Sequence, residues 1–319
     1  MTVDELRSLV EASARDIPVR ELSAAFDRIA ASYDAGRRTE VASRTDAVAY
    51  ALGRALATYS AVECALRETA LVRPGWRPRT VLDLGAGIGS ASLAAIATFD
   101  SIHDVTLVER SEKMMELGTE LVSHSLGDAT WLSGDAAHPP DGIWDLVIAS
   151  YVLSELADAD AVERWFDATA GELVIVEAGT PAAFERLRAV RGRLISRGAA
   201  ITAPCPHENA CPMRDGDWCH FGVRVARSRL QRRVKSGERG FEDEKYAYVV
   251  ASKQGPVARS PRILRRPDRR TGHVRLRLCA EQGVEDIVVS RRHADLYRQA
   301  RKAVWGEAWK TSEPGASPV

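Results

Sequence analysis

Short apolar segments alternate with helix-like stretches between residues 73 and 180, and this alternation limits the folds open to the chain. The apolar segments are residues 80–84, 104–108, 131–132, 146–149 and 173–176. Residues 90–98 and 112–121, which lie between them, have the composition of helices. Strands that alternate with helices predict a parallel sheet covered by crossover helices. We therefore expect an α/β fold.

The first segment leads into a glycine-rich turn at residues 81–90, with the sequence VLDLGAGIGS. Glycines permit a tight turn and a close approach of the backbone to a ligand. At the end of the second segment, Glu109 can accept hydrogen bonds from both ribose hydroxyls of a nucleoside. After the third segment, Asp135 can accept a hydrogen bond from an adenine amine. The order of these groups predicts a nucleoside site.

The spacing of the turn favours one cofactor over another. A G-x-G-x-x-G turn offers a helix N-terminus to a pyrophosphate, whereas this G-x-G-x-G turn follows Asp83, which suits an ammonium group. S-adenosylmethionine is therefore preferred to NAD. Residues 78–180 resemble the class I methyltransferases, and a packing turn in another α/β domain is the alternative. The predicted cofactor-binding residues are Asp83, Gly85, Gly87, Gly89, Glu109 and Asp135.

The catalytic side of this domain carries weaker signals. Ser150, Tyr151 and Glu155 could bind a substrate, although we expect Tyr151 and Leu153 to pack and Glu155 to cap a helix or face solvent. The Asn/Asp-Pro-Pro-aromatic turn of many amino-methylating enzymes is absent here. Residues 73–180 contain no cysteine that could attack a base. The catalytic residues are therefore unknown, and whether the chain is an enzyme is open.

A cluster of thiols marks the C-terminal part of the chain. The cysteines are Cys205, Cys211, Cys219 and Cys279, with C-x5-C-x7-C spacing and then a gap of 59 residues. Prolines next to Cys205 and Cys211 stiffen this loop and can prearrange the thiols as metal ligands. A four-thiolate metal site explains the cluster better than disulfides or unrelated buried cysteines. Zinc stays an alternative, because His207 and His220 are possible substitute ligands.

Neither a targeting segment nor a membrane span is expected. The chain starts with acidic residues and lacks a basic region followed by a long apolar run, which argues against a secretion signal or a transit peptide. The longest apolar runs fall short of the ~20 residues that a membrane span needs. We therefore expect a cytoplasmic, reducing setting and no membrane partner. In such a setting, clustered cysteines usually indicate metal binding or catalysis.

Charge divides the chain into two unlike parts. Residues 1–180 contain 15 Lys and Arg against 29 Asp and Glu, whereas residues 181–319 contain 29 against 15. Arginine-rich runs occupy residues 224–235, 259–270 and 291–302. Arginine forms bidentate contacts with phosphate, which supply affinity without reading sequence. These runs predict an RNA partner, with no DNA partner expected, and an ordinary solvated surface is the alternative.

Several short segments resemble one known family. They are 176–181 (VEAGTP), 204–207 (PCPH), 211–212 (CP), 217–221 (DWCHF), 241–248 (FEDEKYAY), 262–264 (RIL), 273–279 (HVRLRLC) and 305–306 (WG). Residues 78–310 resemble the methyltransferase-like family of the mitochondrial small ribosomal subunit and its bacterial relatives. The resemblance implies a role in small-subunit assembly and translation, with contact to ribosomal RNA. It also implies a [4Fe-4S] cluster, whose ligands would be Cys205, Cys211, Cys219 and Cys279.

The remaining elements follow from periodicity and turn signals. They are helices within residues 1–72, a basic helix at 182–197, an arginine-rich helix around 222–235, a late strand at 246–252, a hairpin of 274–279 and 286–290, and a last helix near 291–304. In the first strand of the hairpin, Cys279 shares a face with Arg275 and Arg277. These cations would favour an anionic cluster nearby, and an ordinary solvated face is the alternative.

The combined prediction is a class I (Rossmann-like) S-adenosylmethionine-dependent methyltransferase fold with an N-terminal helical cap and a metal-bearing C-terminal extension. The expected parts are a helical region (1–72), a Rossmann domain (73–200), a cysteine-rich basic region (201–310) and a disordered tail (311–319). The expected function is a small-subunit assembly factor that binds S-adenosylmethionine, an iron–sulfur cluster and ribosomal RNA. An active rRNA methyltransferase and a small-molecule methyltransferase with a structural zinc site are the alternatives.

Overall fold

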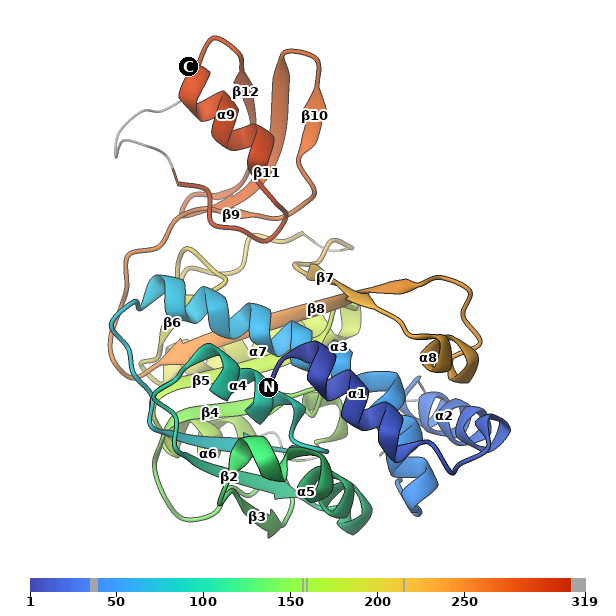
Figure 1. Cartoon of the computed structure of the whole chain (residues 1–319). Coiled ribbons are helices and arrows are strands. Elements are labelled where there is room, and N and C mark those ends of the chain that lie inside the picture. The colour runs from blue at the N-terminus through green and yellow to red at the C-terminus, as the bar shows by residue number, and fades with distance from the viewer. Residues whose placement is uncertain (35–39, 157, 159, 215, 311–319) are drawn as a thin grey trace.

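A computed structural model of the chain describes residues 1–34, 40–156, 158, 160–214 and 216–310. Within these residues, the main sheet contains eight strands (Figure 1). Seven strands follow the order β3-β2-β1-β4-β5-β8-β6, and β7 pairs with one end of β8. The tail predicted at 311–319 lies outside the described residues.

The strands of the first half coincide with the predicted apolar segments. They are β1 (Thr80–Leu84), β2 (Asp104–Glu109), β3 (Thr130–Ser133), β4 (Trp144–Ser150) and β5 (Thr169–Ala178). Neighbours in this group pair in parallel. β1, β4 and β5 are buried along most of their length, as expected of continuous apolar strands whose two faces are both covered by helices.

Two further strands complete one edge of the sheet. β8 (Phe241–Ser252) runs antiparallel to β5, and β6 (Ala200–Ala203) runs antiparallel to β8. The late strand predicted at 246–252 is confirmed and begins earlier, at Phe241. A doubly wound parallel sheet with one antiparallel strand inserted near its edge is the arrangement of the Rossmann-like methyltransferase fold. The strand order therefore confirms the Rossmann-like part of the predicted fold class, and the metal-bearing C-terminal extension stays a prediction.

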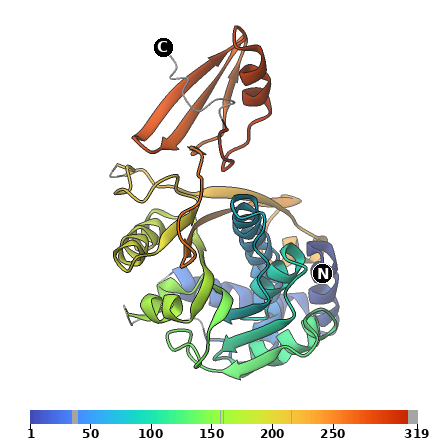
Figure 2. The ribbon, with the colours of Figure 1, turned by 90° about the vertical axis from the view of Figure 1, so that its left-hand side faces the viewer.

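Helices cover both faces of the main sheet (Figure 2). One face carries α3 (Arg44–Val72), α4 (Ser90–Thr98) and α5 (Glu112–Leu126), and the other carries α6 (Ala161–Asp167) and α7 (Pro181–Ser196). Alternate residues of a strand belong to opposite cores, since successive side chains point to opposite faces. Val81 lies in the core on the α3 side, and Leu82 lies in the core on the α7 side.

The helices predicted within residues 1–72 are present as α1 (Val3–Ser13), α2 (Val19–Asp34) and α3. Thr2 and Ser43 start α1 and α3 with capping boxes, in which each hydroxyl accepts the backbone N–H three residues on. α3 is buried along most of its length because it lies between the sheet domain and the two shorter helices. None of the described helices, α3 included, has both the length and the apolar character needed to cross a membrane.

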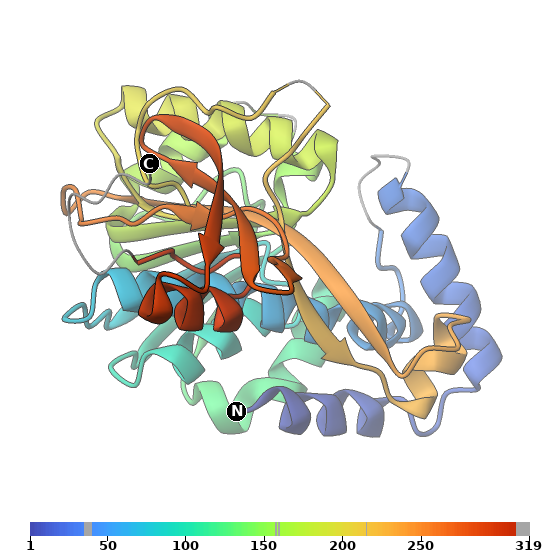
Figure 3. The ribbon, with the colours of Figure 1, turned by 90° about the horizontal axis from the view of Figure 1, so that it is seen from above.

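One predicted helix is partly wrong. Residues 221–226 form a strand, β7 (Phe221–Ala226), and only α8 (Arg229–Val234) is helical. Phe221 and Val225 are buried whereas Arg224 is exposed, so the segment has the alternation of a strand that its arginines obscured. β7 pairs with the first half of β8, and the two strands carry α8 out to α2 (Figure 3).

A second, smaller sheet follows the main domain. Its elements are β9 (Arg262–Ile263), β10 (Asp268–Arg270), β11 (His273–Ala280), β12 (Gly283–Ser290) and the packed helix α9 (Ala294–Lys302). The predicted hairpin and the predicted last helix are confirmed as β11–β12 and α9. This sheet has a core of its own and lies to one side of the main domain (Figure 2).

Candidate cofactor cleft and thiol pocket

The predicted glycine turn joins β1 to α4 through left-handed backbone. Gly85 and Gly87 have φ values of 72° and 59°, a region that favours glycine. The Gly85 N–H donates to the Val108 carbonyl at 2.9 Å, which fixes the turn against the end of β2. Both glycines line a cleft at the carboxyl ends of β1 and β4. Open α/β sheets bind ligands in this position.

Two of the predicted acidic residues line the same cleft. Glu109 accepts the Gly87 N–H and the Ser111 N–H, each at 2.8 Å. Asp135 accepts the Ala137 N–H at 2.9 Å. Backbone donors therefore orient both carboxylates at the cleft. That these groups bind a nucleoside stays a prediction.

The other two predicted cofactor residues lie outside the described lining of the cleft. Asp83 is buried beneath the turn, where its Oδ2 accepts the backbone N–H and the hydroxyl of Ser92, at 3.1 and 2.8 Å. Burial raises the pKa of Asp83 to about 6. Gly89 has a φ of 85° and is the N-cap of α4. Asp83 therefore holds the first turns of α4, and its contact with a ligand ammonium stays a prediction.

The end of β4 and the segment that follows it form another wall of the cleft. Ser150, Tyr151 and Glu155 line it, and Glu155 pairs with Arg110 at 2.6 Å. The packing expected of Tyr151 and Leu153 is confirmed, because they are 8% and 7% exposed. Tyr151 has a φ of 58°, which is uncommon for a residue with a side chain, and its hydroxyl donates to Glu244 at 2.7 Å.

A buried carboxyl group behind the cleft was not predicted. Glu177 lies near the end of β5 and is fully buried, and its Oε1 accepts the Leu153 N–H at 2.8 Å. Its Oε2 has no hydrogen-bond partner among the described residues. Burial raises the pKa of Glu177 to about 7. The carboxyl group therefore holds the turn after β4, and the one sequence signal for it is an acid at the end of an apolar strand.

This carboxyl group makes a testable contribution to pH dependence. Its pKa is 4.5 in the ordinary case and about 7 in the fold. Between these values the native state binds more protons than the unfolded state, so the free energy of unfolding falls as pH rises. The fall attributable to Glu177 is about 3 kcal/mol and is complete above pH ~7.

A Glu177→Gln variant keeps an oxygen for the Leu153 N–H and carries no charge. We expect it to be more stable than the wild type at pH 8 and to lose this advantage near pH 4.5. Urea unfolding of both proteins at the two pH values measures the difference. A stability gap of equal size at both values would show that the Glu177 charge is not what penalises the native state.

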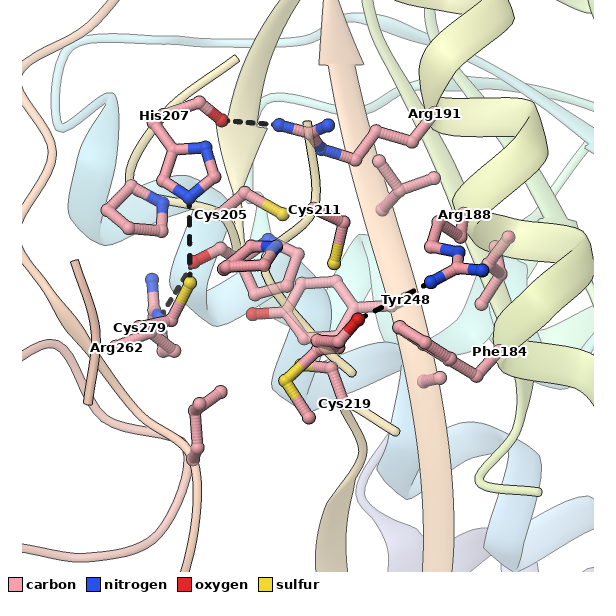
Figure 4. A pocket seen from close by; sticks show the side chains of 18 residues that line it. Phe184, Arg188, Arg191, Cys205, His207, Cys211, Cys219, Tyr248, Arg262 and Cys279 are labelled. Atoms are coloured by element: carbon pink, nitrogen blue, oxygen red, sulfur yellow. Dashed lines mark hydrogen bonds between the residues drawn. The ribbon is translucent and has the colours of Figure 1, made fainter. Parts of the chain in front are cut away.

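The four predicted cysteines line one small cavity (Figure 4). Cys205, Cys211 and Cys219 lie on the loop between β6 and β7, and Cys279 lies near the end of β11. The cavity has a volume of about 50 Å³, and the apolar side chains of Phe184, Leu187 and Leu264 form much of its wall. The structure thus brings together thiols that are separated by 59 residues in the sequence. The fifth cysteine, Cys64, lies in α3 and does not line the cavity.

The thiols affect one another electrostatically. Burial, with the nearby thiols of Cys205 and Cys211, raises the pKa of Cys279 to about 12. Burial raises the pKa of Cys219 well above its usual value, and the other three cysteines add to the effect. The cause is that negative charge on one thiol would repel negative charge on the next. A bound metal cation reverses this penalty, because thiols that coordinate a metal are deprotonated.

Two buried arginines hold the thiol loop in place. Arg191 of α7 donates to the carbonyls of His207 and Asn209 at 2.6 and 3.0 Å. Arg262 of β9 donates to the Pro204 carbonyl at 3.0 Å (Figure 4). Both cations counteract the rise that burial causes in the pKa of Cys205. The pocket therefore combines four thiols with fixed positive charge.

Neither Arg275 nor Arg277, the predicted source of this positive charge, belongs to the described lining of the pocket. The cations that act on Cys279 are Arg191 and Arg262. Arg275 is exposed, and Arg277 lies 3.5 Å from Asp286 and 3.8 Å from Asp217. β11 extends beyond the pocket, so only its last residues lie against the thiol loop.

The thiols do not yet form a coordination sphere. As they stand, the described His, Cys, Asp and Glu side chains contain no group of three or more arranged to hold a metal ion. His207 lines the pocket, and its Nε2 lies 3.7 Å from Cys279 Sγ. His220 stacks on Trp218, with ring centroids 4.9 Å apart. Ligation by the four cysteines, and the choice between iron and zinc, stay predictions.

Comparison with known proteins assigns the chain to a family. The family described as mitochondrial small ribosomal subunit Rsm22 matches residues 44–310. The chain belongs to the Rsm22 family. The human "Ribosome assembly protein METTL17, mitochondrial" is 29% identical to this Rsm22-family chain over 286 residues, which cover 82% of the chain and 61% of the human protein. The resemblance inferred from the sequence is thereby confirmed.

Other relatives are more distant from this Rsm22-family chain. The "Rsm22-cox11 tandem protein 2, mitochondrial" of Schizosaccharomyces pombe is 24% identical over 287 residues, which cover 71% of the chain and 38% of the yeast protein. The chain thus spans 61% and 38% of the lengths of these two relatives. A solved structure of magnesium protoporphyrin IX methyltransferase from Synechocystis, with bound SAH, is 14% identical. The match covers 73% of this chain and 100% of the methyltransferase chain, with a TM-score of 0.41. This similarity is low, so the fold assignment depends on the strand order.

Fewer arginines are available to a partner than the three arginine-rich runs of the sequence suggest. Arg224 pairs with Asp243, and Arg227 pairs with Glu242. Arg229, Arg232 and Arg233 of α8 instead line a shallow surface pocket. Arg291 and Arg292 are exposed on the turn that follows β12. Positive charge open to a partner therefore lies on α8 and on the small sheet.

Proposed function

We propose that the chain is an assembly factor of the small ribosomal subunit built on a methyltransferase-like domain. The observation that carries the proposal is the convergence of Cys205, Cys211, Cys219 and Cys279 on one cavity in an Rsm22-family chain. This convergence would let a single inorganic group connect the thiol loop of the main domain to the small basic sheet. The name of the human relative, a ribosome assembly protein, supports the role.

An iron–sulfur cluster is the group that we propose for the thiol pocket, with zinc as the alternative. The donors fit, because burial and neighbouring thiols raise the pKa of Cys205, Cys219 and Cys279, and two buried arginines lie beside them. Cys205, Cys211, Cys219 and Cys279 would hold the cluster. Ligation by thiolates from two distant segments would stabilise the fold, since metal binding free energy becomes folding free energy. We assign the cluster no redox step.

S-adenosylmethionine is the ligand that we propose for the cleft. Gly85 and Gly87 leave the turn without side chains, Glu109 suits the ribose hydroxyls, and Asp135 suits the adenine amine. Ser150, Tyr151 and Glu155 border the same cleft, and we assign none of them a catalytic role. Binding of the cofactor therefore does not by itself imply methyl transfer.

Ribosomal RNA is the partner that we propose for the basic surface. The arginines of α8 and the turn at Arg291 and Arg292 suit phosphate contacts, because guanidinium groups bind phosphate in a bidentate manner. Such contacts give affinity that falls steeply with salt concentration. This salt dependence distinguishes the proposal from a small-molecule methyltransferase with a zinc site.

Co-sedimentation tests the proposed function. The purified chain is mixed with isolated small ribosomal subunits, or with large subunits as the control, and centrifuged at low and at high salt. We expect the chain to sediment with small subunits at low salt, to be released at high salt, and to stay in the supernatant with large subunits. Failure to bind small subunits at low salt would contradict the proposal.

A further inference from the structure

We propose that a second cavity, next to the cofactor cleft, receives a nucleobase of single-stranded RNA. The inference rests on the proposed RNA binding and names the site at which a base would be held. The cavity has a volume of about 410 Å³. Phe26 of α2, Arg54 of α3, Tyr151 after β4, and Lys245 of β8 are among the residues that line it.

The position of this cavity links it to the cofactor cleft. Residues 178–180, at the end of β5, form one side, and Tyr151, which follows β4, forms another. Ligands of open α/β sheets bind outside the carboxyl ends of the strands. Tyr50 and Tyr151 line both the cavity and the cofactor cleft. A group held in the cavity would therefore lie directly beside a nucleoside held in the cleft.

The walls of the cavity suit a flat aromatic ligand. Phe26, Tyr50 and Tyr151 supply aromatic rings. The guanidinium carbon of Arg54 lies 4.9 Å from the centre of the Tyr151 ring. Unstacked RNA bases are commonly held against aromatic rings and guanidinium planes. The side chains here offer both kinds of surface.

One of these surfaces is held in place by an ionic network. Glu244 Oε1 accepts the Tyr151 hydroxyl at 2.7 Å and Arg54 Nη2 at 2.9 Å. Glu244 and Arg54 have side chains that are 11% and 29% exposed, so water screens the pair only in part. The left-handed φ of Tyr151, 58°, is a strained conformation of the kind found at binding sites. The Tyr151 ring is thus preorganised at the boundary between the two sites.

A lysine at the rim of the cavity favours a nucleotide over an uncharged ligand, because the acidic lining residues Asp243 and Glu244 are paired with Arg224 and Arg54. Lys245 lines the cavity and is exposed. Lys235 also lines it but pairs with Glu242 at 2.7 Å; it directly follows α8, whose Arg229, Arg232 and Arg233 line the neighbouring surface pocket. The basic surface therefore leads to the cavity. Phosphates of a single strand can follow this surface while one base enters between the aromatic rings.

The test compares a short fluorescein-labelled single-stranded RNA with the same strand lacking its bases. Anisotropy measures the binding of both by the full chain and by three variants: Tyr50→Ala, the ring-preserving Tyr50→Phe, and Lys253→Ala. Lys253 lies just beyond the opposite end of β8 from Lys245 and serves as a remote control. We expect the wild type to prefer the intact strand. Tyr50→Ala should weaken binding of that strand by about five-fold to a hundred-fold.

The variants separate base recognition from general RNA binding. Tyr50→Phe and Lys253→Ala should keep the preference for the intact strand, and Tyr50→Ala should bind both strands alike. Equal binding of both strands by the wild type would overturn the inference while leaving RNA binding intact. Binding of neither strand would overturn both the inference and the proposed RNA partner. An unchanged preference in Tyr50→Ala would also overturn the inference.

Discussion

Replacing Cys279 by serine is expected to remove bound metal from the protein and to lower its free energy of unfolding by about 5 kcal/mol or more. Cys279 is the one thiol of the pocket that belongs to the small sheet. Without it, the other three thiols cannot connect that sheet to the main domain through a shared group. Metal content per chain and urea unfolding, both measured on anaerobically purified protein, report the two effects.

Cys64→Ser is the matched control for this variant. Cys64 is partly buried in α3 and lies outside the thiol pocket. We expect the Cys64→Ser variant to retain the metal and its free energy of unfolding to fall by at most about 1 kcal/mol. Equal metal content in Cys279→Ser, Cys64→Ser and the wild type would mean that Cys279 is not a ligand. In a soluble Cys279→Ser protein, this result is independent of any change in stability.

Replacing Gly85 by valine is expected to abolish measurable binding of S-adenosylmethionine. At its φ of 72°, a β-branched side chain is strained. The added Cβ would also lie 3.1 Å from Val152 Cγ2, so side chains that line the cleft would have to move. Titration calorimetry with S-adenosylmethionine measures the loss, and far-ultraviolet circular dichroism checks that the fold remains.

Gly192→Ala provides the control for that substitution. Gly192 lies within α7, and a Cβ there meets no atom within 4 Å. Alanine in a helix is more favourable than glycine by about 1 kcal/mol, so this variant should bind S-adenosylmethionine normally and be slightly more stable. Undiminished binding by a folded Gly85→Val protein would mean that the ligand does not approach this turn.

The central strands of the main sheet were predictable because each is a mostly apolar run. The strands at residues 80–84 and 146–149 can be predicted from their own composition, since burial on both faces requires apolar runs. β7 was harder, because Arg224 interrupts it and pairs across the ladder with Asp243 of β8. Pairing with β8 makes this segment a strand rather than a helix, and no local pattern in the sequence of β7 reveals that pairing.

The sequence predicted which residues belong to the candidate sites better than it predicted the contacts that those residues make. The pattern of Cys205, Cys211 and Cys219 indicates a shared site, but only the fold shows that Cys279 reaches it. The sequence did not identify Arg191 and Arg262 as neighbours of the thiols. They belong to α7 and β9, on either side of the thiol loop in the sequence, and only the fold brings both to it. Asp83 belongs to the predicted motif, yet its hydrogen bonds to Ser92 place it beneath the turn. Spacing alone does not reveal which side of a turn a side chain occupies.

Iron and acid-labile sulfide analysis of the wild-type chain, purified under argon, tests whether the four thiols of the pocket hold an iron–sulfur cluster. We expect a brown protein with about four iron atoms and four sulfides per chain, as a cubane cluster on four thiolates requires. A colourless protein with no iron, or with one tightly bound zinc per chain, would contradict this expectation.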